Sequence, residues 1–139
     1  MAMVAFSAAA ILCAPTEASY RPPDRIWGSY TAVSASGAGA ARLFDRPKEI
    51  GVGLSRDKRG QWIGWKANCN GSGAQMRVGH KRMRLGPITS SSVGCANLTG
   101  RQDSWLGSLF TADPRWQLKR GLLVLRAGQR VLRLRTDSG

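Results

Sequence analysis

The chain has 139 residues, enough for one domain with a modest hydrophobic core. Hydrophobic residues make up 42% and charged residues 21%, a balance that excludes disorder over most of the length. Its charge is unusual, because 21 Lys and Arg face 8 Asp and Glu, for a formal net charge of +13. The basic residues form no run of about five or six that would act as a nucleic-acid-binding arm. The excess therefore either maintains solubility or serves a polyanionic partner.

An apolar, alanine-rich stretch occupies residues 4–14. It is too short to span a bilayer as a helix, but it suits the hydrophobic region of a secretory signal. Small residues at Thr16 and Ala18 predict cleavage after Ala18, although no Lys or Arg precedes the stretch, which leaves the natural start open. We therefore expect a signal peptide at 1–18 and a periplasmic or secreted protein, with outer-membrane association as one form of this. Its removal also removes Cys13, and the remaining even pair, Cys69 and Cys95, predicts a disulfide.

The elements predicted next are mostly short strands. Residues 19–25 form a proline-rich lead-in, residues 26–33 a first strand, and residues 34–41 a flexible loop of small residues. Ile50, Val52 and Leu54 alternate with small residues, which is the two-residue period of a strand. A turn at 57–60 and a returning strand at 61–67 follow. Asn70-Gly71 is a hairpin signal, and further short strands are predicted at 74–78 and 83–85.

One helix interrupts the strands. Thr99 and Gln102 have the spacing of a capping box at its start, and Pro114 prevents it from continuing. Four apolar residues fall on one face of this helix: Trp105, Leu106, Leu109 and Phe110. That face requires an apolar surface against which to pack.

A final hairpin is predicted from strands at 122–125 and 131–134 around a turn at 127–129. In its last strand Leu132 and Leu134 lie on one side, and Arg133 and Arg135 lie on the other, as in a sheet with one solvated face. Short strands of this kind must protect their edges, which a curved or closed sheet does. The sequence thus predicts a mainly β, α+β fold: a curved, antiparallel, barrel-like sheet with one packed amphipathic helix.

The sequence contains no pattern typical of catalysis or of metal binding. His80 is the single histidine, and together with Cys69 and Cys95 it would supply at most three ligands without zinc spacing. No two carboxylates mark a general acid and base, and the serines at 90–92 lack the elbow motif of a nucleophile. The five tryptophans could stack on bases, but their apolar neighbours favour positions in the core. We expect no enzyme, no catalytic or metal site, and no cofactor.

Four segments carry a resemblance to a known family. Trp65-Lys66-Ala67-Asn68-Cys69-Asn70 looks like the Cys-Asn signature of META domains, the HslJ-like family. Met83-Arg84-Leu85-Gly86-Pro87-Ile88 resembles the family strand that leads into a Ser/Thr-rich turn, and Thr89 to Cys95 (TSSSVGC) resembles that turn, with Gly94 before the cysteine. Residues 105–110 and 116–134 are similar to the family's helix and its final two strands.

The resemblance implies a domain over residues 26–136, a compact barrel-like sheet with one helix, and Asn70 and Gly94 as motif residues beside the cysteines. It also implies a cell-envelope protein, often stress-related, without a known reaction. We therefore expect a monomeric, non-enzymatic envelope protein that binds or stabilises envelope components, such as anionic lipid or lipopolysaccharide, through its cationic surface. The residues expected to make these contacts are Arg82, Arg84, Arg133 and Arg135.

Two other functions stay open on the sequence. One is an exported inhibitor of a cell-wall hydrolase, although an inhibitor of basic lysozymes would be expected to be acidic. The other is a basic nucleic-acid-binding module, which requires that the N-terminal segment be retained and the protein not exported. Export counts against nucleic acid as a partner.

Overall fold

The structure is a computed structural model that describes residues 20–91 and 94–137. The signal peptide predicted at 1–18 lies outside the described residues. Two α-helices, nine strands and two short 3₁₀ turns, Asp24–Ile26 (η2) and Pro47–Glu49 (η3), make up the described chain. The helices are α1 (Ala40–Leu43) and α2 (Asn97–Thr111). The strands are β1 (Gly28–Ser36), β2 (Gly51–Asp57), β3 (Gly60–Lys66), β4 (Gly71–Val78), β5 (Met83–Leu85), β6 (Thr89–Ser90), β7 (Arg115–Lys119), β8 (Leu122–Ala127) and β9 (Arg130–Thr136).

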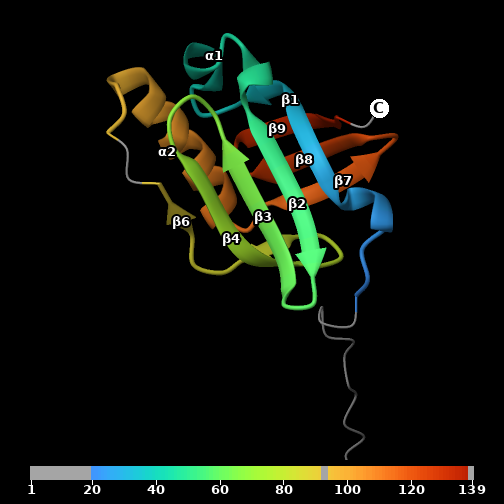
Figure 1. Cartoon of the computed structure of the whole chain (residues 1–139). Coiled ribbons are helices and arrows are strands. Elements are labelled where there is room, and N and C mark those ends of the chain that lie inside the picture. The colour runs from blue at the N-terminus through green and yellow to red at the C-terminus, as the bar shows by residue number, and fades with distance from the viewer. Residues whose placement is uncertain (1–19, 92–93, 138–139) are drawn as a thin grey trace, which may run out of the picture.

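All nine strands belong to one antiparallel sheet with the order β5-β4-β3-β2-β1-β9-β8-β7, and β6 also pairs with β4. The two ends of this order meet at a seam, where Arg82 and Arg115 form a β-bridge. On either side of it, the Met83 N–H donates to the Pro114 carbonyl at 2.9 Å and the Trp116 N–H donates to the Lys81 carbonyl at 3.0 Å. The sheet is therefore a nearly closed barrel, as Figure 1 shows, and the predicted fold class is confirmed.

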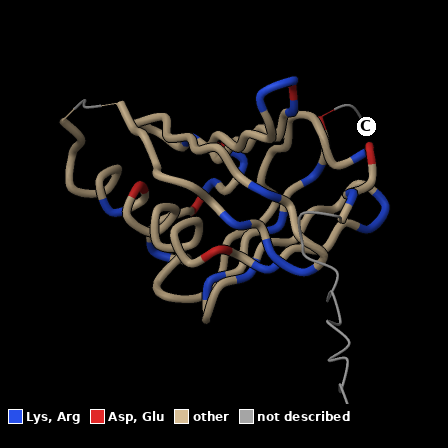
Figure 2. The backbone as a smooth tube through the Cα atoms, turned by 90° about the horizontal axis from the view of Figure 1, so that it is seen from below, with Lys and Arg blue, Asp and Glu red and all other residues tan. Residues whose placement is uncertain are grey.

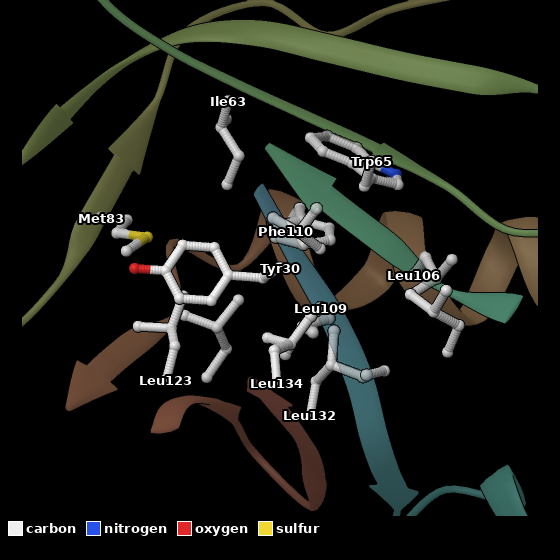
Figure 3. Close-up of a cluster of buried hydrophobic side chains, with 14 of the residues drawn as sticks. Tyr30, Ile63, Trp65, Met83, Leu106, Leu109, Phe110, Leu123, Leu132 and Leu134 are labelled. Carbon is white, nitrogen blue, oxygen red and sulfur yellow. The ribbon is translucent and has the colours of Figure 1, made fainter. Parts of the chain in front are cut away.

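The core fills the inside of this barrel because apolar residues alternate inward along the strands. Side chains from opposite walls meet there, including Tyr30 of β1, Ile63 of β3, Leu123 of β8 and Leu132 of β9 (Figure 3). Tyr30 is 2% exposed, and its hydroxyl donates to the Ile26 carbonyl at 2.7 Å. Burial raises the pKa of Tyr30 above 10.0, and the nearby charge of Arg25 partly opposes that rise.

Helix α2 packs its apolar face against the inside of the sheet, as predicted. Trp105, Leu106, Leu109 and Phe110 are all buried. The ring of Phe110 stacks on Trp65 of β3, with ring centroids 4.0 Å apart. The indole N–H of Trp105 donates to the Gly37 carbonyl at 2.9 Å, which joins the helix to the turn after β1.

The start of α2 differs from the predicted capping box. The helix begins at Asn97 with Ala96 at the cap position and no side-chain cap. Thr99 instead donates its hydroxyl to the Ala96 carbonyl. Gln102 is 2% exposed, and its side-chain amide donates to the Leu43 carbonyl at 2.6 Å. This tertiary contact occupies the side chain that was predicted to complete the capping box.

Two further predictions are corrected in part. Residues 34–41 are not simply a loop, because β1 continues to Ser36 and α1 begins at Ala40. Gly37 between them has φ +84°, and a Cβ there would overlap the Gln129 carbonyl, so this turn requires glycine. The segment predicted to hold two strands, residues 116–134, holds parts of three, since β7 precedes the predicted hairpin.

Candidate anion-binding face

The outer side of β7, β8 and β9 carries five basic residues that define a basic face: Arg115, Lys119, Arg126, Arg133 and Arg135. They lie there because successive side chains alternate across a strand, and the inward positions hold buried leucines in β8 and β9 and the half-buried Trp116 and Leu118 in β7. Figure 2 shows Lys and Arg along the strands and their turns, whereas α2 carries only Arg101. The molecule therefore presents its positive charge mainly on the sheet.

Apolar residues lie between the cations of the basic face. Val124 of β8 is opposite Gln117 in β7 and Arg133 in β9, and Leu122 is opposite Lys119 and Arg135. Val124 is 9% exposed yet is not part of the central core cluster, which fits its outward position. The long stems of arginine and lysine side chains can cover such residues while their charges stay in water. The face thus combines cations with an apolar centre.

Strand register also places like charges side by side. Arg115 is directly opposite Arg126 in β8 and bridges to Arg82 on its other side. Arg77 of β4 is likewise opposite Arg84 of β5. Like charges directly opposite each other in a sheet are destabilising, so the pairing of Arg115 with Arg126 costs folding free energy unless an anion offsets it.

Carboxylates do little to neutralise the basic face. Among the described residues, Asp24 forms its salt bridge with Arg56 of β2, at 3.0 Å, and not with a cation of β7–β9. Asp137, next to the end of β9, accepts a hydrogen bond from the Thr31 hydroxyl at 2.5 Å. None of the five basic residues of the face forms a salt bridge with a described carboxylate. The face keeps its positive charge.

The four contact residues predicted from sequence do not form one cluster. Arg133 and Arg135 lie on the basic face, as expected from the alternation in β9. Arg84 is exposed on β5, across the seam. Arg82 is half-buried and donates to the Asp113 carbonyl at 3.2 Å, so part of its side chain holds the turn before β7.

Sequence reasoning missed Arg115, Lys119 and Arg126. The signal was present in residues 115–119, which alternate polar and apolar positions over a full short strand. The turn to β8 obscured it, because Arg120 and Gly121 both have positive φ, 52° and 76°, where Asn-Gly is the usual hairpin pair.

Cys69 and Cys95 form a disulfide, with Cα atoms 6.0 Å apart, as predicted. It joins the β3–β4 loop to the segment before α2. The Asn70 side-chain amide donates to the Cys95 sulfur at 3.1 Å and its oxygen accepts from the Ser91 hydroxyl at 3.0 Å, which gives the Cys-Asn pair a structural role. At Gly94, a Cβ would meet open space, so packing does not require glycine there.

One group of possible metal ligands lies at this disulfide. Cys69, Cys95 and Asp103 have donor atoms within 4.8 Å of one another. The two sulfurs are bonded to each other, and thiolate is the form of cysteine that binds metal. The Asp103 carboxylate also lies 3.4 Å from the Asn70 backbone N–H, so the group fits a structural contact better than a metal site.

A hollow of about 740 Å³ lies on the outer side of β1–β3. It exists because Gly51, Gly53 and Gly64 face outward and leave the sheet without side chains. Lys66 and Asp137 are the charged residues that line it. With no cluster of cations, this surface is a weaker candidate than the basic face for binding an anion.

No helix within residues 20–91 and 94–137 combines the length and apolar character needed to cross a bilayer. The META domain family model matches residues 26–138 of the chain. No curated protein matches it. A solved structure described as the NMR structure of the protein from Burkholderia xenovorans is similar in fold, with a TM-score of 0.59 and 12% identity, over 86% of this chain and 94% of that one.

Proposed function

The chain belongs to the META domain family, and from this premise we propose that it is a non-enzymatic cell-envelope protein that binds anionic envelope lipid, including lipopolysaccharide, through its basic face. The observation that carries the proposal is the set of five cations on β7–β9 without carboxylate partners among the described residues. Anionic headgroups attract such cations, and the apolar centre at Leu122 and Val124 suits contact with the interfacial region of a bilayer. By binding there, the protein would stabilise the membrane surface, which would give it a role in envelope stress.

A binding role also agrees with the surroundings of the residues that could do chemistry. The His80 ring lies against Tyr20, with centroids 5.2 Å apart, and no described carboxylate or hydroxyl is hydrogen-bonded to it. In a nucleophilic site, the histidine base normally lies about 2.6–3.2 Å from the nucleophile and is oriented by a third group. Asp113 accepts the Leu85 N–H at 2.9 Å and thereby supports the seam.

Vesicle co-sedimentation tests the proposal. The protein should bind vesicles that contain anionic lipid, should not bind zwitterionic vesicles, and should lose binding as ionic strength rises from about 0.01 M to 1 M, where the Debye length falls from about 30 Å to 3 Å. Binding that ignores salt, or that is equal on both vesicle types, would contradict an electrostatic role for the face.

A pair of matched variants locates the binding surface. Arg133→Gln with Arg135→Gln removes two charges from the basic face, and Arg42→Gln with Arg101→Gln removes two exposed charges from the helical side. Each cation near an anionic surface contributes about 1 kcal/mol, so the first variant should bind about 30-fold more weakly and the second nearly normally. Equal weakening in both variants would mean that net charge, and not this face, drives binding.

Export is tested separately by the mass of the protein from an envelope fraction. Cleavage after Ala18 would leave a mature chain that begins at Ser19. A full-length chain recovered from the cytoplasmic fraction would remove the envelope location from the proposal.

A further inference from the structure

A groove of about 400 Å³ lies on the outer side of the seam, where β7 meets the turn between β4 and β5. Lys81, Arg115 and Arg126 line it, and His80 lies with them. Trp116 and Val124 add apolar lining. The groove therefore gathers three cations around a space of molecular size. A second hollow of the basic face, about 470 Å³, is lined by Lys119, Arg120, Leu122 and Arg135.

Backbone contacts hold the two sides of this groove together. Arg115 is paired with Arg126 on one side and bridged to Arg82 on the other. The Trp116 backbone N–H donates to the Lys81 carbonyl at 3.0 Å, and its indole N–H donates to the Gly79 carbonyl at 2.9 Å. Arg115 and Arg126 thus lie on paired strands, and Lys81 lies on a turn that is hydrogen-bonded to β7. The backbone spacing of the three cations is fixed before any ligand arrives, which lowers the entropic cost of binding.

The charges in the groove repel one another in the free protein. Residues directly opposite in an antiparallel pair have Cβ atoms about 4.5–5.5 Å apart, and like charges at such positions destabilise the sheet. Arg115 and Arg126 occupy such positions, and neither they nor Lys81 form a salt bridge with a described carboxylate. An oxyanion bound between them would replace this repulsion with charge-assisted hydrogen bonds.

We propose that this groove binds a phosphate group through Arg115, Arg126 and Lys81. The proposal deepens the proposed function, on which it rests for the choice of an envelope anion. Arginine presents a planar fork of donors that fits the oxygens of phosphate, and two forks with an ammonium suit a dianion better than a carboxylate with one charge. The group can come from free phosphate or from the phosphomonoester headgroup of a lipid.

Titration of the full chain with inorganic phosphate, followed by amide NMR signals, tests the groove. Arg115→Gln with Arg126→Gln removes two charges from it, and Arg42→Gln with Arg101→Gln removes two exposed charges from the helical side. Loss of charge-assisted hydrogen bonds should weaken phosphate binding at least about tenfold in the first variant and less than about twofold in the second. Equal weakening in both, or no saturable binding by the unaltered protein, would overturn the proposal.

Thermal unfolding separates a ligand-binding role of the two arginines from a structural one. At low ionic strength without phosphate, the groove variant should unfold at a higher temperature than the unaltered protein because the repulsion is gone. Added phosphate should then raise the midpoint of the unaltered protein and leave that of the variant in place. If the variant is less stable in phosphate-free buffer and responds to phosphate as before, Arg115 and Arg126 serve the fold and the proposal is wrong.

Vesicles distinguish the two sources of phosphate and separate this proposal from the proposed function. A preference for phosphatidic acid over phosphatidylglycerol vesicles of equal surface charge, lost in the groove variant, identifies a lipid headgroup. Phosphate binding without that preference identifies free phosphate. If the protein binds vesicles but the two double variants have equal affinities for phosphate, the groove proposal is wrong and the proposed function stands. If the protein binds phosphate saturably but binds no vesicles, the groove proposal stands and the proposed function is wrong.

Discussion

Removal of the disulfide between Cys69 and Cys95 should destabilise the protein by about 3.5 kcal/mol. The bond closes a loop with a sequence separation of 26 residues, and the chain-entropy relation gives about 3.5 kcal/mol for a loop of that length at 25 °C. The domain should still fold, because the buried residues of α2 and of the facing strands do not depend on the bond. A cost of this size corresponds to a fall in unfolding midpoint of roughly 10–20 °C.

Equilibrium unfolding in guanidinium chloride measures this cost. The double variant Cys69→Ala with Cys95→Ala is compared with the unaltered protein, and the unaltered protein with added reductant serves as the control that keeps both sulfurs. Both treatments should lower the free energy of unfolding by similar amounts. A loss below about 1 kcal/mol would mean that the loop is already restricted in the denatured chain, which would refute the entropic reasoning. A variant that does not fold at all would refute the independence of the core.

Four further substitutions test the core and the turns. Phe110→Ala removes the ring stacked on Trp65 and should cost about 3–5 kcal/mol in denaturant unfolding, whereas a cost near zero would contradict the packing. Tyr30 has a pKa above 10.0 in the folded state because of burial, so the unfolded chain loses this proton first and stability should fall as pH rises past about 10. In Tyr30→Phe, the unfolding midpoint should decrease less steeply above about pH 10. An unchanged decrease would mean that another group causes the loss of stability at alkaline pH. Gly37→Ala places a Cβ against the Gln129 carbonyl and should lower the unfolding midpoint clearly, while Gly94→Ala, with open space around it, should not.

The parts of the fold that sequence predicted are those governed by local pattern. The alternation of Ile50, Val52 and Leu54 placed a strand with its buried face correctly, as did the alternation around Leu132. The spacing of Trp105 and Phe110 identified the buried face of α2. In each case one hydrophobic period decides which side of an element is buried, and no distant partner is needed.

The parts that sequence missed depend on distant partners. Gln102 had the spacing of a capping residue, but its amide is used by the Leu43 carbonyl, a contact that only the folded chain brings together. The pairing of Arg115 with Arg126 likewise depends on the register that the Arg120-Gly121 turn sets. For that reason the candidate site was predicted in part, at Arg133 and Arg135, and its groove was not predicted at all.

Paramagnetic lipid in anionic bicelles offers the most direct test of the claim that the basic face contacts anionic lipid. Such lipid broadens the amide signals that lie nearest to it. Amide signals from β7, β8 and β9 should broaden, and those from α2 should stay sharp. The strongest broadening is expected at Gln117, Val124 and Arg133. Broadening centred on α2, or on the glycine-lined surface of β1–β3, with β7–β9 unaffected, would contradict that claim.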